Sequence, residues 1–442
     1  ESILGAVSRT TTATLAAFEN MSWKREDLDV LLKQRENISE IPEVAGSYYV
    51  SRAVDQAFWA VINGEETPQA AVSLSSAKTM IKVEAVNSES GKISLYYVQI
   101  KRFFAEEYRP QFHFTEKETW INDPNGLVYD AYTETYHMFY QYCEGVNNDG
   151  QFYWGHAVSK DLVNWERKDP ALAPDQNGII FSGSCVVDEN NDSGWFDDSV
   201  PPQSRLVAFF TYHQANPSIG CAYSTDFGET WQKVGKVIEN KNNVYGDNFR
   251  DPKVIRVDGK WLMITGGWAN VRLFSSENLS DWTLDSEVLD YFGNNLQSEC
   301  PDIFPLAVDG DEENVKWVIT TAGTSYIVGR LEQIDGKFVF TAEAPGYKMY
   351  NCIPTWTNQG EMYATQSYYN DKTGRRILVS WMIDRTANEI EDKEWNGAQS
   401  LPLETDLITV NGMIVMRGYP VEEVETLRGT KRLEIKDAAL GE

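Results

Sequence analysis

The sequence predicts an all-β propeller that follows a mainly α-helical N-terminal region. Three observations lead to this fold class. Before residue 108, apolar residues recur at the three- and four-residue spacing of helices. From Gln111 the chain changes to short β-branched and aromatic runs separated by Gly, Asn and Asp, which is typical of many strands joined by tight turns. A turn motif ending in Trp recurs along this second part, as a radial repeat requires.

Length and composition exclude several classes of protein. The chain has 442 residues, and 42% of them are hydrophobic, so it can bury a large core and is too apolar to be mainly disordered. A net charge of -27 would repel a nucleic acid backbone. Apolar runs such as 206–212 are far shorter than the roughly 20 residues of a membrane span. We therefore expect no nucleic acid partner and no membrane span, and the oligomeric state stays open.

Residues 1–108 are predicted to form the helical region. Leu28, Leu31 and Leu32 fall on one helical face, and Thr67-Pro68 is typical of an N-cap followed by proline at the first helical position. The segments 41–52 and 64–68 resemble the C-terminal part of extracellular solute-binding proteins of ABC importers, within a similarity over roughly residues 20–105. Because this is only a fragment of such a domain, we expect a packing module with no ligand of its own.

Residues 109–410 are predicted to form the propeller. Segments 159–165, 224–231 and 276–282 each place a Ser ahead of a turn that ends in Trp, namely Trp165, Trp231 and Trp282. Ser and Asp cap such turns, and we expect the Trp to pack between blades. The spacing suits four-stranded blades, and residues 111–410 have room for about five.

Three acidic segments are candidates for chemistry. Asp123 lies in the turn-forming run Asn-Asp-Pro-Asn-Gly, and Asp251 lies between Arg250 and a proline that leads an apolar strand. Burial beside Arg250 would keep Asp251 ionised and able to stabilise a positive transition state. Glu299 precedes a Cys-Pro step and an apolar strand, as a desolvated general acid would.

The three segments fall at corresponding strand starts of three different blades. We therefore expect Asp123, Asp251 and Glu299 to converge on the central axis. Two carboxylates flanking a glycosidic bond, with a third beside an oxocarbenium-like centre, form the apparatus of a glycosidase.

Six ordered motifs resemble those of glycoside hydrolase family 32, which contains invertases, inulinases, levanases and related fructosyltransferases. They lie at 122–126, 139–142, 154–159, 181–184, 249–254 and 299–302, and further similarity at 363–367 and 400–402 extends the match over about residues 109–403. The resemblance implies a five-bladed propeller, an axial active site and retention of anomeric configuration, with no metal or other cofactor. The strong acidity and the 14 Trp residues are compatible with a secreted protein, so we expect an extracellular location, with a cytoplasmic one still open.

The resemblance also implies residue roles on a β-fructofuranosyl unit of sucrose or a fructan such as inulin or levan. Asp123 would be the nucleophile, Glu299 the acid/base, and Asp251 the stabiliser of the transition state together with Arg250. The fructose subsite would be lined by Asn122, Gln141, Phe181, Ser182 and Arg250.

The sequence departs from the family pattern at several positions. Asp149-Gly150 stands where the family usually has a Trp-Gly pair that walls the pocket, Cys143-Glu144 replaces Asn-Pro, and Leu403 replaces an Arg. These changes bear on substrate preference. Residues 411–442 are expected to be the start of a C-terminal extension, or of a truncated form of the β-sandwich that usually follows the propeller.

Three alternatives remain at this point. A fructosyltransferase would use the same intermediate. A non-catalytic fructan-binding propeller would explain the missing pocket Trp and the N-terminal region, but would not need all three carboxylates. The Ser-x-Asp-x-Gly-x-Thr-Trp turn at 224–231 is also found in sialidase-like propellers, which use a Tyr nucleophile.

Overall fold

The computed structural model describes residues 80–87, 93–101, 109–146, 148, 150–267, 270–322, 325–348, 361–383 and 395–428. The chain divides into two compact units, Glu1–Gln111 and Phe112–Glu442. The described residues of the first unit before 102 form an antiparallel pair, β1 (Met80–Asn87) and β2 (Ile93–Lys101). Within the region 1–108 that the sequence predicts to be mainly helical, these two segments are strands instead, and the rest of it lies outside the described residues. Most of the segment that resembles solute-binding proteins also lies outside them.

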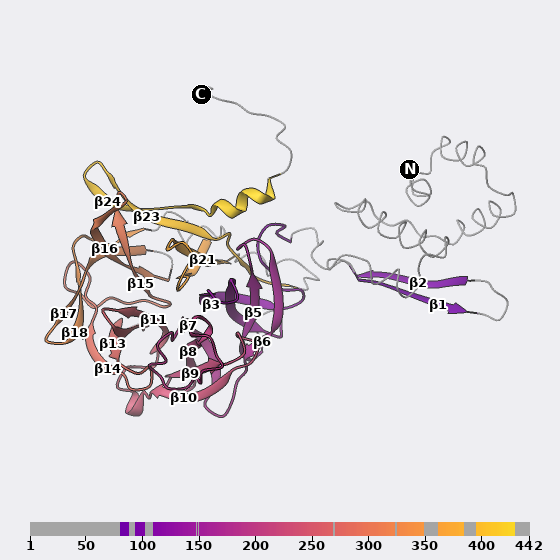
Figure 1. Ribbon diagram of the computed structural model, residues 1–442, viewed down its shortest axis with the longest axis horizontal. Helices are drawn as coiled ribbons and strands as arrows, with labels where there is room; N and C mark the ends of the chain where they lie inside the picture. Colours follow the sequence, from indigo (N-terminus) through magenta and orange to yellow (C-terminus); the bar gives the residue numbers. More distant parts are fainter. Residues whose placement is uncertain are drawn as a thin grey trace, which may run out of the picture. The chain divides into compact units, whose positions relative to one another are not determined.

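The second unit is built of sheets, and in the first three of them the strands are antiparallel and pair in sequence order. Figure 1 shows these sheets arranged around a centre, with β7 and β11 on the inside and β10 and β14 on the outside. The first three sheets have four strands each: β3 (Trp120–Asp130), β4 (Thr135–Cys143), β5 (Phe152–Ser159) and β6 (Trp165–Leu172); β7 (Ile179–Val187), β8 (Leu206–His213), β9 (Ser218–Ser224) and β10 (Gln232–Ile238); β11 (Arg250–Val257), β12 (Lys260–Gly266), β13 (Arg272–Ser276) and β14 (Thr283–Glu287). This arrangement is that of a propeller-type domain.

The remaining strands form one larger sheet. A parallel bridge between Val308 and Leu407 joins a fourth antiparallel meander to the last strands of the chain. The strands are β15 (Asp302–Val308), β16 (Asp311–Thr321), β17 (Ser325–Ile334), β18 (Lys337–Ala342), β19 (Tyr347–Lys348), β20 (Glu361–Ser367), β21 (Arg376–Ile383), β22 (Ala398–Gln399), β23 (Leu403–Val410) and β24 (Met413–Pro420). Short 3-10 helices occur at Pro202–Ser204, Lys241–Asn243 and Glu422–Leu427.

The described residues after 410 belong to this sheet. β24 pairs with β23 along its whole length. Val421 is buried, and Glu423 forms an ion pair with Arg375 at 2.8 Å. A strand pair and an ion pair therefore attach this segment to the propeller-type unit.

The repeated Trp turns have the structure that the sequence predicts. In the first turn, Ser159 donates to Asp161, and in the second, Ser224 donates to Asp226. The three turns share a left-handed residue at the same position: Leu162, Phe227 and Leu279, with φ between 61° and 62°. Two of the Trp rings pack edge-on against core aromatics of a neighbouring sheet, Trp231 on Phe139 and Trp282 on Phe209. For Trp231 and Trp282, the prediction that the Trp packs between blades is confirmed.

The core lies between neighbouring sheets rather than at the centre of one. Phe139 of the first sheet and Phe210 of the second share one buried cluster, and Phe209 and Trp261 join the second sheet to the third. Each such side chain contributes roughly 1.5–3 kcal/mol on burial. The first strands of the sheets are thereby held in fixed positions around the centre.

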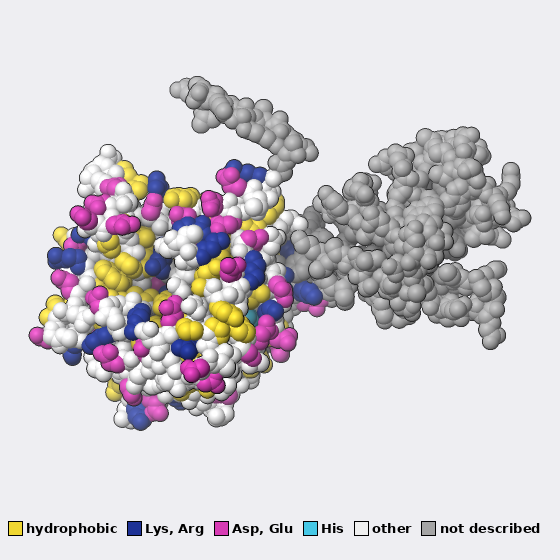
Figure 2. All heavy atoms as spheres, in the orientation of Figure 1, with side chains coloured by type: hydrophobic (Ala, Val, Ile, Leu, Met, Phe, Trp, Pro, Cys, Tyr) yellow, Lys and Arg dark blue, Asp and Glu magenta, His cyan; other side chains and the backbone are white. Residues whose placement is uncertain are grey.

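The surface of the described unit mixes charges of both signs. Figure 2 shows Asp and Glu side chains scattered among Lys and Arg over the visible face. Among the described residues, no helix is long and apolar enough to cross a membrane.

Candidate active site

Irregularities near the starts of the inner strands place the site residues. The register of β3 with β4 shifts between Ile121 and Pro124, and Asp123 lies in that shift. Ser182 occupies the corresponding shift of β7, and Asp251 that of β11. Pro124 and Pro252 follow the two aspartates and have no N–H to give to a ladder. Such bulges redirect side chains away from the normal alternation of a strand.

Gly183 allows the backbone approach at the second of these bulges. A Cβ atom at this position would lie 1.9 Å from the carbonyl oxygen of Phe209 on β8. The lack of a side chain therefore lets β7 pass close to β8 directly after Ser182.

Asp123 is held by three donors. The Ser182 hydroxyl donates to Oδ2 at 2.6 Å, the Asn122 amide donates to Oδ1 at 3.0 Å, and the Cys300 thiol lies 3.3 Å from Oδ2. Burial raises the pKa of Asp123, while these three hydrogen bonds oppose the rise. The carboxylate thus has a fixed orientation and needs its donors to stay ionised.

Asp251 is 5% exposed and has a left-handed backbone, with a φ of 57°. Its Oδ2 accepts the backbone N–H of Cys300 at 2.9 Å and lies 3.6 Å from Nε of Arg250. Burial raises the pKa of Asp251 to about 6, although the Arg250 charge acts to lower it. The sequence-based expectation that Arg250 keeps this group ionised therefore holds only above about pH 6, because desolvation outweighs the ion pair.

Cys300 connects the two aspartates. Its thiol lies 3.3 Å from Asp123 Oδ2 and 3.6 Å from Asp251 Oδ2. The residue is 3% exposed with a φ of 39°, and burial followed by the surrounding carboxylates raises the pKa of the thiol far above its usual value. Cys300 is therefore a protonated donor that faces two carboxylates.

Glu299 lies at the more open side of the cluster. One carboxylate oxygen accepts from the Arg250 guanidinium, and the other accepts from the Tyr363 hydroxyl. Its side chain is 27% exposed, compared with 6% for Asp251. Glu299 lies ahead of β15, as the sequence predicts, and its side chain stays partly exposed there.

The three segments that were expected to meet do lie together. Arg250 contacts both Asp251 and Glu299, and the backbone and thiol of Cys300 connect that pair to Asp123. Two of the three carboxylates therefore pair with one guanidinium, and the third, Asp123, is joined to them through Cys300. When all are ionised, the cluster carries net negative charge and favours a cationic centre placed among them.

Three other residues predicted to line a sugar subsite, Asn122, Gln141 and Phe181, lie on β3, β4 and β7. Gln141 of β4 is 2% exposed, and its amide nitrogen has no hydrogen-bond partner in the described part of the chain. The Phe181 ring stacks on His213 at 4.1 Å. Asn122 accepts from the Trp120 indole at 2.9 Å while donating to Asp123. The Gln141 amide nitrogen is thus a buried donor that can still form hydrogen bonds.

A buried ion pair underlies the site. Lys253 Nζ lies 3.2 Å from Asp302 Oδ2, and both side chains are almost completely buried. Asp302 also accepts the backbone N–H of Ser367 at 2.6 Å. The pair therefore ties β11, β15 and β20 together directly beneath Asp251 and Glu299.

The residues that depart from the family pattern have different surroundings. Asp149 lies outside the described residues. Cys143 is buried at the end of β4, where its sulfur accepts the N–H of Gly150 at 3.1 Å. Leu403 opens β23 and pairs with Leu378.

Sequence reasoning missed two residues that contact the carboxylates, Cys300 and Tyr363. Both lie in motifs that had been noted, but nothing in a single sequence shows that the Tyr363 hydroxyl reaches Glu299 from a different part of the chain. Within the described residues, no group of three or more His, Cys, Asp or Glu is placed to hold a metal ion.

The fold and the cluster define a carbohydrate-active propeller of the glycosidase type. The model of the glycosyl hydrolases family 32 N-terminal domain matches residues 113–417. The chain therefore belongs to glycoside hydrolase family 32.

Several relatives are similar over most of this chain. A levanase of Bacillus subtilis (strain 168) is 38% identical over 354 residues, covering 75% of this chain and 49% of the relative. A fructan beta-fructosidase of Streptococcus mutans is 33% identical over 81% of this chain and 26% of its own length. An extracellular exo-inulinase of Aspergillus niger is 33% identical over 72% of this chain and 66% of its own length. The chain thus spans half or less of the two bacterial relatives.

Two solved structures of fructan- or fructoside-cleaving enzymes are similar to this chain. A fructofuranosidase from Schwanniomyces occidentalis in complex with fructosylnystose matches with a TM-score of 0.63 and 29% identity, over 73% of this chain and 64% of that chain. An exo-inulinase from Aspergillus awamori matches with a TM-score of 0.62 and 30% identity, over 74% and 70%.

Proposed function

We propose that this chain is a retaining glycoside hydrolase that cleaves β-fructofuranosyl linkages of fructans and sucrose. The observation that carries the proposal is the cluster of Asp123, Asp251 and Glu299, which Arg250 and Cys300 connect. Family membership and the names of the relatives, a levanase, a fructan beta-fructosidase and an exo-inulinase, support the same substrate class.

Asp123 is proposed as the nucleophile. Its carboxylate attacks the anomeric carbon of the fructosyl unit and forms an ester, while the bond from that carbon to the leaving oxygen breaks. The donors Ser182 and Asn122 support this role, since they fix both carboxylate oxygens and oppose the effect of burial on the pKa.

Glu299 is proposed as the acid/base. It gives its proton to the leaving oxygen in the first step, then takes a proton from a water molecule that attacks the anomeric carbon and releases Asp123. Its greater exposure suits a group that must meet both a leaving alcohol and water. Tyr363 and Arg250 orient its two oxygens.

Asp251 is proposed to stabilise the positive charge that develops on the fructosyl ring. The burial of Asp251 and its ion pair with Arg250 support this role, because a buried carboxylate interacts strongly with a nearby cation. Asn122, Gln141, Phe181, Ser182 and Arg250 are proposed to line the subsite. The unpartnered amide of Gln141 is available for a sugar hydroxyl.

We further propose that the propeller has five blades, with β20 to β23 forming the fifth. Five buried clusters support this count, since together they join each proposed blade to the next and the fifth back to the first. We also propose an extracellular location, supported by relatives described as extracellular.

Product analysis tests the proposed activity. The purified chain, Glu299→Gln and the surface control Glu277→Gln are incubated with sucrose, inulin and levan in parallel. The parent and Glu277→Gln should release fructose, and Glu299→Gln should lose at least ~10²-fold in kcat/KM. Formation of longer fructosides in place of free fructose would replace hydrolysis by transfer. No turnover of any substrate by the folded parent would contradict the proposal.

A further inference from the structure

A second pocket lies at the other end of the inner strands. It has a volume of about 450 Å³, within the roughly 300–1,000 Å³ range of small-molecule sites. Its lining comes from the last residues of β11, from β15 and β16, and from the turn between β20 and β21. Of the lining residues on β11, Ile255 is the nearest to Asp251 and lies four residues beyond it, which corresponds to roughly 13 Å at about 3.3 Å per residue. The pocket is therefore separate from the carboxylate cluster.

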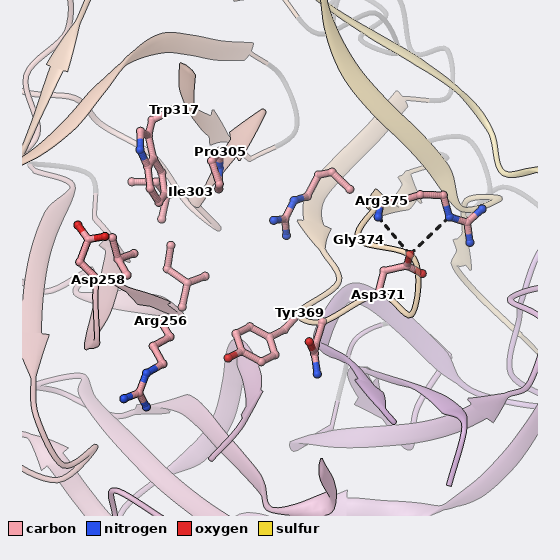
Figure 3. Close-up of a pocket in the computed structure, with 13 residues that line it drawn as sticks. Arg256, Asp258, Ile303, Pro305, Trp317, Tyr369, Asp371, Gly374 and Arg375 are labelled. Carbon is pink, nitrogen blue, oxygen red and sulfur yellow. Dashed lines mark hydrogen bonds and ion pairs between the residues drawn. The ribbon is translucent and has the colours of Figure 1, made fainter. Parts of the chain in front are cut away.

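Two aromatic rings form apolar walls of this pocket. Trp317 of β16 and Tyr369 after β20 are both partly exposed, and Figure 3 shows them on different sides of the open space. The Tyr369 ring also packs against three buried clusters, and burial raises the pKa of its hydroxyl, so what it offers the pocket is mainly an apolar face. The Trp317 ring packs against one of these clusters and presents its remaining face to the pocket.

Both hydrogen-bond donors and hydrogen-bond acceptors line the pocket beside these rings. Arg256 already pairs with Asp192, and Arg375 already pairs with Glu423. Asp258 and Asn370 are exposed at the rim and present acceptors. The pocket thus offers donors and acceptors together, with most of its charges already compensated. An anion would meet Asp258, whereas hydroxyl groups can both donate to and accept from such a lining.

We propose that this pocket is a second, non-catalytic site for a neutral carbohydrate of one or two rings. The C–H faces of the sugar pack on Trp317 and Tyr369, and its hydroxyls bond to Arg256, Asp258 and Asn370. If the proposed function holds, a second site also retains the enzyme on a polymeric fructan, because it raises the effective concentration of chain ends.

Calorimetric titration of Glu299→Gln with sucrose and with a short fructo-oligosaccharide tests this inference. Two binding events per chain are expected, one at each site. Adding Trp317→Ala should remove or weaken one event by at least about 10-fold, whereas adding Tyr132→Ala, an exposed tyrosine outside the pocket, should leave both. In the active chain, Trp317→Ala should keep the parent's kcat/KM on sucrose.

The exposed variant Asp258→Ala covers the case in which Trp317→Ala does not fold, and it should weaken the same event. A single binding event that persists unchanged in Trp317→Ala or Asp258→Ala would overturn the inference, as would two events that both persist in these variants. A single event that Trp317→Ala removes would instead support the second site and contradict fructoside binding at the carboxylate cluster. Binding is measured in an inactive variant, so failure of the proposed hydrolysis and failure of this inference give different results.

Discussion

Replacement of Ser182 by Ala should shift the acidic limb of the pH–rate profile upward. Burial raises the pKa of Asp123, and the Ser182 hydroxyl at 2.6 Å is the first of the groups that oppose this rise. A hydrogen bond to a charged group contributes about 1.5–3 kcal/mol, and one pKa unit corresponds to about 1.4 kcal/mol. Loss of this donor should therefore move the limb by about 1–2 pH units, although the limb reports the whole coupled cluster.

The assay is fructose release at low substrate concentration between pH 3 and pH 8. Ser184→Ala is the matched control, since Ser184 is a buried serine of the same strand whose hydroxyl accepts the Val254 N–H at 2.9 Å and touches no carboxylate. It should leave the limb in place. A folded Ser182→Ala enzyme with an unshifted limb, whatever its rate, would refute the view that this hydroxyl keeps the nucleophile ionised.

Three further predictions concern the cluster and the core. Azide should restore the activity of Glu299→Ala on an aryl β-fructofuranoside, because azide attacks without a general base. NMR should show a fructosyl azide of retained configuration. A product of inverted configuration would contradict Asp123 as the nucleophile. In the folded protein the pKa of Asp251 is about 6, against 3.8 normally, so the stability that Asp251 contributes is lost as the pH rises through that interval. The difference in Tm between Asp251→Asn and the parent should therefore favour the variant more at pH 7 than at pH 4. An equal difference at the two pH values would count against the raised pKa. Burial lowers the pKa of His137 from 6.5 to about 4, so the stability that His137 contributes falls by up to about 1.4 kcal/mol per pH unit on acidification across that interval. In thermal unfolding, His137→Phe should lose less stability than the parent as the pH falls. An identical pH dependence of the two proteins would exclude His137 as the cause.

The propeller was predictable from the sequence because its signals are local. The Ser-to-Trp turns at 159–165, 224–231 and 276–282 depend on short-range capping, which acts in the same way wherever the turn lies. The same holds for the Asp-Pro steps at Asp123 and Asp251, since proline interrupts the strand ladder whatever surrounds it. The sequence by itself therefore determined the strand-rich class and the three acidic candidates.

Other features depend on residues brought together from distant parts of the chain. Arg250 bonding to Glu299, Tyr363 reaching the same carboxylate and Cys300 lying between two aspartates are contacts across different sheets. Whether Asp251 or Glu299 is the more desolvated likewise depends on what packs around each one. Only the tertiary structure decided these matters, because burial and Coulomb interactions depend on separation in space, which a single sequence does not contain.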